Sequence, residues 1–164
     1  MATNRIKLQG KAKWARVFEN NRDMEGFEGN YRPYNGAYTI QLEMDKENFD
    51  KLEATGAAKA SKARRKEVDR LGSVEIKFER KHNDRFEWAS GAPKVYKKDG
   101  SEWSFSDDGL IGNDSDVELE ISVYTTSKAT GTRLESVLVL NPVEYNEFTK
   151  DHSSSPAISE EVPF

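Results

Sequence analysis

The chain has 164 residues, of which 35% are hydrophobic and 33% are charged, so we expect one small domain whose core is seeded by 8 Phe, 6 Tyr and 3 Trp. No apolar run approaches the ~18 residues that a membrane-spanning helix needs, which excludes a membrane partner. The lack of cysteine excludes disulfides, thiolate zinc sites and cysteine nucleophiles, and with no apolar stretch at the N-terminus it predicts a cytoplasmic location.

The net charge of −4 is distributed unevenly along the chain. Residues 59–98 carry 13 basic and 6 acidic side chains, whereas residues 99–164 carry 3 basic and 14 acidic ones. Residues 5–16 add basic side chains without any acid. This asymmetry predicts a surface that binds a polyanion and an acidic segment that opposes it, with ordinary solvated charge as the alternative.

Residues 5–18 are predicted to form a long first strand. Apolar residues such as Leu8 and Trp14 hold the even positions and cations hold the odd ones, so period two places Trp14 in the core. Residues 20–36, rich in Asn, Gly and charge, are typical of a loop. Residues 37–44 alternate again and predict a second strand.

A helix is predicted to follow the second strand. Asp45 can cap it, Phe49 and Leu52 lie three residues apart on one face, and the alanines that follow favour helix. Its basic end, residues 62–66, fits either an exposed helix or a loop.

The second half of the chain contains further strands. Residues 73–80, 117–123 and 134–140 have the apolar patterns of strands. Residues 93–103 are predicted to form a hairpin around Asp99–Gly100.

These elements predict a mainly β fold, a five-stranded OB-type barrel with a helix and a hairpin insertion. The helix follows the second strand, whereas most OB folds place it after the third. The barrel is expected to span residues 1–150. Residues 151–164, with their run of serines, are expected to form a disordered, acidic C-terminal tail.

Aromatic and basic residues are interleaved in the first loop and around the hairpin. Unpaired nucleic acid needs this combination, because bases stack on rings and phosphates need cations. The alternative is that the rings pack the core. The predicted DNA-binding residues are Lys11, Lys13, Tyr31, Arg32, Tyr34, Arg80, Lys81, Arg85, Trp88, Lys94, Tyr96, Lys97, Lys98 and Trp103.

The C-terminus carries a separate signal. Two carboxylates precede an apolar end that bears the α-carboxylate, a chemistry that suits capture by a cationic pocket on a partner protein. The same segment can compete with DNA for the protein's own cations, and the alternative is an inert end. The predicted partner-binding residues are Glu160, Glu161, Val162, Pro163 and Phe164.

The C-terminal end resembles the acidic Pro-Phe tip of bacterial single-stranded-DNA-binding proteins. The body resembles phage single-stranded-DNA-binding (helix-destabilising) proteins of the DUF2815 kind. This resemblance implies an OB fold, sequence-independent binding in phage DNA replication, recombination and repair, and a tail that recruits replication proteins in the host cytoplasm. The matching stretches are WARVFE (14–19), GAPKV (91–95) with DG (99–100), LIGNDS (110–115), VY (123–124) and LVLNPVEY (138–145).

Two other functional classes stay open. The acids Asp107, Asp108, Asp114 and Asp116 are the one candidate for a metal-dependent nuclease, but their spacing matches no EF-hand loop, and we expect neither an enzyme nor a cofactor or metal. A protein-interaction adaptor would use the tail alone and has no use for the basic segment. A homodimer is compatible with the sequence.

Overall fold

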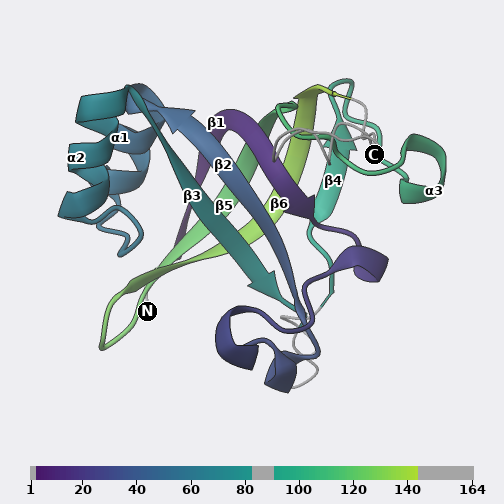
Figure 1. Ribbon diagram of the computed structural model, residues 1–164, viewed down its shortest axis with the longest axis horizontal. Coiled ribbons are helices and arrows are strands. Elements are labelled where there is room, and N and C mark those ends of the chain that lie inside the picture. Colours follow the sequence, from purple (N-terminus) through teal and green to yellow (C-terminus); the bar gives the residue numbers. More distant parts are fainter. Residues whose placement is uncertain (1–2, 83–90, 144–164) are drawn as a thin grey trace, which may run out of the picture.

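The computed structural model describes residues 3–82 and 91–143 and has a mainly β architecture (Figure 1). One six-stranded sheet has the order β3-β2-β1-β5-β6-β4. The strands are β1 (Thr3–Arg16), β2 (Ala37–Asp45), β3 (Ser73–Lys81), β4 (Lys94–Lys97), β5 (Asp116–Thr125) and β6 (Thr130–Asn141). The helices are α1 (Lys46–Ala54), α2 (Lys62–Leu71) and the short α3 (Phe105–Asp108), with 3-10 turns η1 (Glu19–Asn21), η2 (Phe27–Gly29) and η3 (Arg32–Tyr34).

The five predicted strands are all present, but the prediction of a five-stranded sheet is wrong because β4 adds a sixth. β4 is the first limb of the predicted hairpin, which turns at Asp99–Gly100 and returns through a single bridge between Tyr96 and Glu102. β4 also pairs in parallel with β6. A parallel partner some forty residues away leaves no local signal, so the sequence shows the turn and misses the pairing.

The helical region forms two helices and not one. Asp45 caps α1 as predicted, because its carboxylate accepts the backbone N–H of Asn48 at 2.9 Å. The chain leaves α1 after Ala54, and Gly56 adopts a φ of 81°, a left-handed conformation that suits glycine. Figure 1 shows α1 and α2 together at the end of the sheet where β2 finishes and β3 begins. The longest described helix has 10 residues, and no described helix combines the length and apolar character of a membrane span.

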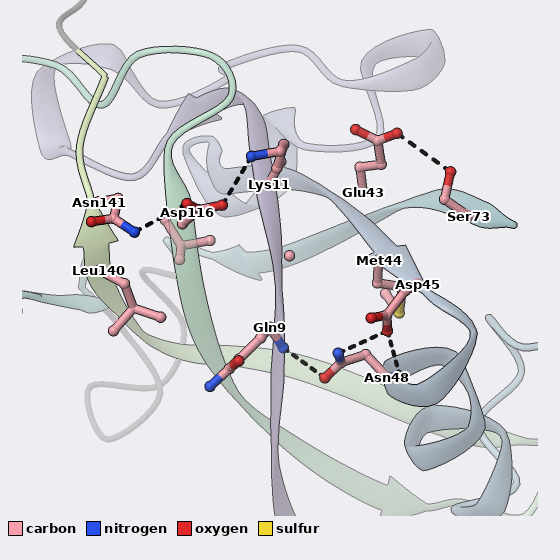
Figure 2. Close-up of a pocket in the computed structure, with 12 residues that line it drawn as sticks. Gln9, Lys11, Glu43, Met44, Asp45, Asn48, Ser73, Asp116, Leu140 and Asn141 are labelled. Atoms are coloured by element: carbon pink, nitrogen blue, oxygen red, sulfur yellow. Dashed lines mark hydrogen bonds and ion pairs between the residues drawn. The ribbon is translucent and has the colours of Figure 1, made fainter.

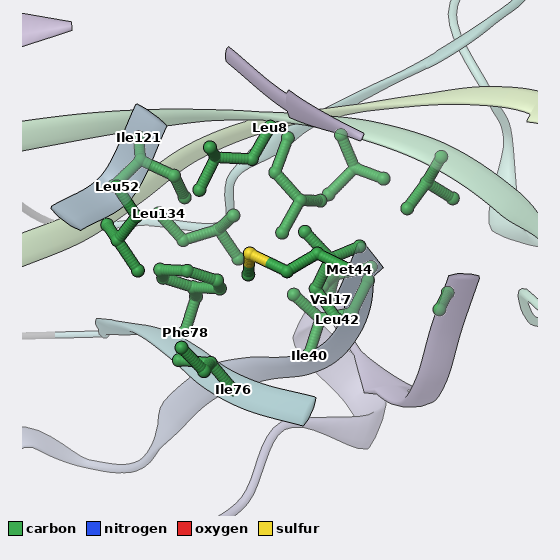
Figure 3. Packing of buried hydrophobic residues seen from close by; sticks show 14 of the residues in the cluster. Leu8, Val17, Ile40, Leu42, Met44, Leu52, Ile76, Phe78, Ile121 and Leu134 are labelled. Carbon is green, nitrogen blue, oxygen red and sulfur yellow. The ribbon is translucent and has the colours of Figure 1, made fainter. Parts of the chain in front are cut away.

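The core lies inside the curled sheet. Alternation along β2 and β3 points Ile40 and Phe78 inward, where both are fully buried. Figure 3 shows them meeting Leu8 of β1, Ile121 of β5 and Leu134 of β6, all also fully buried. Burial of side chains of this size stabilises the fold by about 1.5–3 kcal/mol each. These contacts join both halves of the sheet into one barrel-like core.

Trp14 does not lie in the core, contrary to the prediction. The β1–β2 register shifts between Lys13 and Arg16, and Trp14 takes a φ of 51° within this bulge. A bulge inserts one residue and reverses the inside–outside alternation beyond it. Val17 is therefore fully buried, while Trp14 is 47% exposed.

Candidate nucleic-acid interface

The solvent side of β1, β2 and β3 holds the best candidate surface. Register pairs Lys13 with Gln41 and Gln41 with Lys77, and one row further Arg16 lies opposite Thr39, whose own side chain is buried. Strand alternation turns these side chains away from the core, opposite to Ile40 and Phe78. We call this surface, with Lys81 at the end of β3, the outer face.

The loop between β1 and β2 folds over one end of the outer face. Tyr31 is only 3% exposed, and its hydroxyl donates a hydrogen bond to Glu79 of β3. Burial, the hydrogen bond and the charge of Glu79 all raise the pKa of the Tyr31 hydroxyl. The Lys77 ammonium lies 5.5 Å from the centre of the Tyr31 ring. In this conformation the buried Tyr31 ring offers no free face to a base, and its predicted contact with DNA stays a prediction.

Tyr34 of the first loop and Lys81 of β3, two residues that were predicted as members of separate groups, bring a ring and a cation together. The Lys81 ammonium lies 4.5 Å from the centre of the Tyr34 ring, Lys81 is exposed and Tyr34 is half-buried. No carboxylate pairs with Lys81 among residues 3–82 and 91–143. The local chain is shaped by Arg22, whose guanidinium donates to the carbonyls of Glu19 and Asn35 at 2.7 and 2.8 Å. A phosphate can approach Lys81 without displacing a carboxylate.

Other predicted cations already have acidic partners. Lys11 lies 3.0 Å from Asp116, and Lys13 pairs with Asp114. Arg32 pairs with Glu25 at 2.6 Å. Hydrogen bonding to Asp114 raises the pKa of Lys13 against the opposing effect of burial. Exposed ion pairs contribute only about 0–1 kcal/mol, so a phosphate can replace these carboxylates at small cost.

Arg80, one of the predicted DNA-binding residues, makes structural contacts in this fold, and its role in DNA binding stays a prediction. It shares the inward parity of Phe78, and only 12% of its side chain is exposed. Its guanidinium donates to the carbonyls of Gly91 at 3.0 Å and Leu134 at 3.4 Å, and to the Glu135 carboxylate at 3.3 Å. Burial lowers the pKa of Arg80. Arg80 thus links the edge strand β3 to β6.

The hairpin residues form a second group, away from the outer face. β4 lies at the opposite end of the sheet order from β3. Lys94 and Lys98 are exposed and Tyr96 is half-buried, while Lys97 pairs with Asp108 at 3.2 Å. Arg80, which faces inward from β3, contacts the carbonyl of Gly91, three residues before β4 begins.

Trp103 anchors the hairpin. Its indole N–H donates to the Gly109 carbonyl at 2.9 Å, and its ring packs against the core. It borders a pocket of about 550 Å³ together with Lys98, Leu140 and Val143. These contacts give Trp103 a structural role, and its predicted stacking role stays a prediction.

The remaining predicted residues lie outside the described part of the chain, so their predictions stay predictions. They are Arg85, Trp88, Glu160, Glu161, Val162, Pro163 and Phe164.

Sequence reasoning missed several exposed apolar side chains. Trp14 is 47% exposed, Phe27 78% and Phe105 37%. The sequence did contain a sign that Trp14 leaves the core. Arg16 stands at an even position, where β1 is otherwise apolar, and Val17 stands at an odd position, where β1 is otherwise polar. That exchange of parity indicates a bulge. Phe27 has no comparable signal, since loop residues show no period.

The described carboxylates do not form a metal site. Asp108, Asp114 and Asp116 each pair with a different lysine, and no cluster of three or more metal-ligating side chains occurs in the described ranges. Nothing in the described geometry favours the hypothesis of a metal-dependent nuclease.

A pocket of about 520 Å³ is lined by residues of β1, β2, β3, β5 and β6 and by Asn48 of α1 (Figure 2). Its lining is largely self-paired: the backbone N–H of Gln9 donates to Asn48 at 2.9 Å, and Asp116 accepts from Lys11 at 3.0 Å and from Asn141 at 3.2 Å. It lacks the pairing of a ring with a cation that marks the outer face.

The sequence matches no protein-family model and no curated protein. Solved structures do match the fold. The crystal structure of gp2.5, a single-stranded DNA-binding protein encoded by bacteriophage T7, superposes with a TM-score of 0.58 and 13% identity over 97% of this chain and 100% of that one. The single-stranded DNA-binding protein from bacteriophage Enc34 in complex with ssDNA gives a TM-score of 0.53 and 16% identity over 86% and 88% of the two chains. Its C-terminally truncated form gives 0.52 and 15% over 87% and 88%. The chain is therefore similar in fold to single-stranded DNA-binding proteins of bacteriophages.

Proposed function

We propose that this protein binds single-stranded DNA without sequence preference, through an OB-type barrel whose outer face contacts the strand. The observation that carries the proposal is the Tyr34 ring beside the Lys81 ammonium, 4.5 Å apart, on a barrel similar to phage proteins that bind single-stranded DNA. Rings offer stacking to any base, and cations neutralise phosphates. Neither contact reads base edges, so sequence should matter little.

The proposal extends to the biological role. The protein acts in phage DNA replication, recombination and repair, where it protects single strands in the host cytoplasm. It is not an enzyme. Residues 1–150 bind DNA, and the tail of residues 151–164 recruits replication proteins through its acidic, apolar end. The support for recruitment is the chemistry of residues 160–164, two carboxylates followed by an apolar terminus.

A fluorescence titration tests DNA binding. Full-length protein is titrated with a dT homopolymer at two salt concentrations, with a variant that ends at residue 159 beside it. We expect tryptophan quenching, affinity that falls steeply with salt, and similar affinity for dA and dT homopolymers. The truncated variant should bind DNA equally or more tightly and lose partner recruitment.

Two outcomes would redirect the assignment. Absence of both quenching and salt-sensitive retention on single-stranded DNA would remove the proposal and favour the adaptor. Cleavage of a labelled oligonucleotide that requires Mg²⁺ and stops with chelator would favour the nuclease.

A further inference from the structure

The bulge of β1 is held by the turn before β5. The backbone N–H of Trp14 donates to the Asn113 side-chain carbonyl at 2.8 Å, and the N–H of Asp114 donates to the Ala12 carbonyl at 2.8 Å. The N–H of Ala12 in turn donates to the Ser115 carbonyl at 2.8 Å. We call residues 12–14 and 113–115 the clasp.

The clasp contains two strained residues. Trp14 has a φ of 51° and Asp114 a φ of 72°, both in the left-handed region that residues other than glycine rarely adopt. For a bulky residue such as tryptophan this conformation is uncommon and costs free energy. The surrounding hydrogen bonds must offset that cost, and strain of this kind concentrates at functional sites.

The left-handed conformation of Trp14 turns its side chain out of the core. In regular strand geometry position 14 would face the core with Leu8 and Ala12, which are fully buried. The left-handed turn instead leaves the indole 47% exposed. Lys13 directly precedes Trp14 in the chain, and its ammonium pairs with the largely exposed Asp114 carboxylate. An exposed indole that follows a lysine in the chain supplies the two kinds of side chain that bind an unpaired nucleotide.

We propose that Trp14 stacks on an unpaired base of bound single-stranded DNA and that Asn113 is the positioning residue that holds it outward. This inference rests on the proposed function and adds a contact on β1 to the Tyr34–Lys81 pair. Lys13 contacts the phosphate beside the stacked base, in place of Asp114.

The test compares Trp14→Leu, which keeps an apolar side chain without a ring, with Trp14→Phe, which keeps a ring. Leu71→Ala is the control, since Leu71 is 57% exposed at the end of α2, remote in sequence from the clasp. Affinity for a labelled dT oligonucleotide is measured by anisotropy at two salt concentrations, and urea unfolding is recorded for each protein.

Trp14→Leu should weaken binding about 5- to 150-fold, the range expected for loss of one base stack. Trp14→Phe should weaken it less, and the salt slope should stay unchanged because no charge is removed. Trp14→Phe should also lose part of the quenching amplitude on DNA addition. Asn113→Ala should reduce both affinity and quenching while Trp14 is still present.

Unchanged affinity of Trp14→Leu, with wild-type protein that binds, would overturn this inference and leave the proposed function standing. Wild-type protein that does not bind would overturn both. If Trp14→Leu fails to fold, the comparison of Trp14→Phe with wild type decides, and an unchanged quenching amplitude would overturn the stacking role.

Discussion

Replacement of Arg80 by methionine tests whether this residue holds the barrel or binds DNA. The guanidinium donates to Gly91, Leu134 and Glu135 at 3.0, 3.4 and 3.3 Å, and the Arg80 and Glu135 side chains are 12% and 10% exposed. Loss of a hydrogen bond to a charged group costs about 1.5–3 kcal/mol, and breaking a buried ion pair costs about 3–5 kcal/mol. Glu135 is not left alone, because Ser122 and another arginine still donate to it at 2.5 and 2.8 Å.

We therefore expect Arg80→Met to lower the free energy of unfolding by about 2–3 kcal/mol, below the full cost of an unpaired buried charge. Urea unfolding followed by circular dichroism at pH 7 measures the loss. Arg70→Met is the control, since Arg70 is exposed on α2 and should change stability by less than about 0.5 kcal/mol. Arg80→Met that stays as stable as wild type and binds DNA more weakly would refute the structural role and return Arg80 to the interface.

Three further changes probe the charges of the described surface. Lys81→Ala should reduce the slope of log affinity against log salt by about 0.7, the value for one phosphate contact on a single strand, while Lys66→Ala on α2 should leave it unchanged. Asp114→Asn keeps the shape, tolerates the φ of 72° and removes the nearer of the two acidic partners of Lys13, leaving Glu43 at 3.9 Å. DNA affinity measured by anisotropy should therefore rise, and a fall would contradict replacement of the Asp114 carboxylate by phosphate. Hydrogen bonds at the α1 N-terminus lower the pKa of Asp45, so the stabilisation of the fold by the ionised Asp45 carboxylate is present above about pH 4 and is lost as the pH falls through the lowered pKa. Asp45→Ala should therefore lower the free energy of unfolding by about 1 kcal/mol in urea at pH 7 and by less at about pH 2. An equal loss at both pH values would contradict this dependence on the ionised carboxylate.

Local periodicity was enough to predict most of the elements. Tyr38 and Phe78 are buried where alternation placed them, and the cap at Asp45 and the turn at Asp99–Gly100 were both readable from neighbouring residues. Each of these features depends on side chains a few positions apart. A pattern of that length is preserved in the folded chain unless a bulge interrupts it.

The candidate interface was only partly predictable. Both Tyr34 and Lys81 were candidates from their residue types, but only the fold brings them together, and Tyr31 is buried against Glu79, 48 residues further along the chain. The basic side of β1 was predicted as an open polyanion surface, yet Lys11 is paired with an acid 105 residues away. Charge counted along the chain cannot show which charges meet across strands.

The sequence alone determined the five predicted strands, the start of α1 at Asp45 and the coexistence of rings with cations, because hydrophobic period and residue type are local properties. Only the tertiary structure decided that Trp14 faces water, that Arg80 links β3 to β6 and that β4 joins the sheet. These outcomes depend on register and on partners distant in the chain. Hydrogen-bond geometry between strands selects them, and a one-residue shift reverses which side chains are buried.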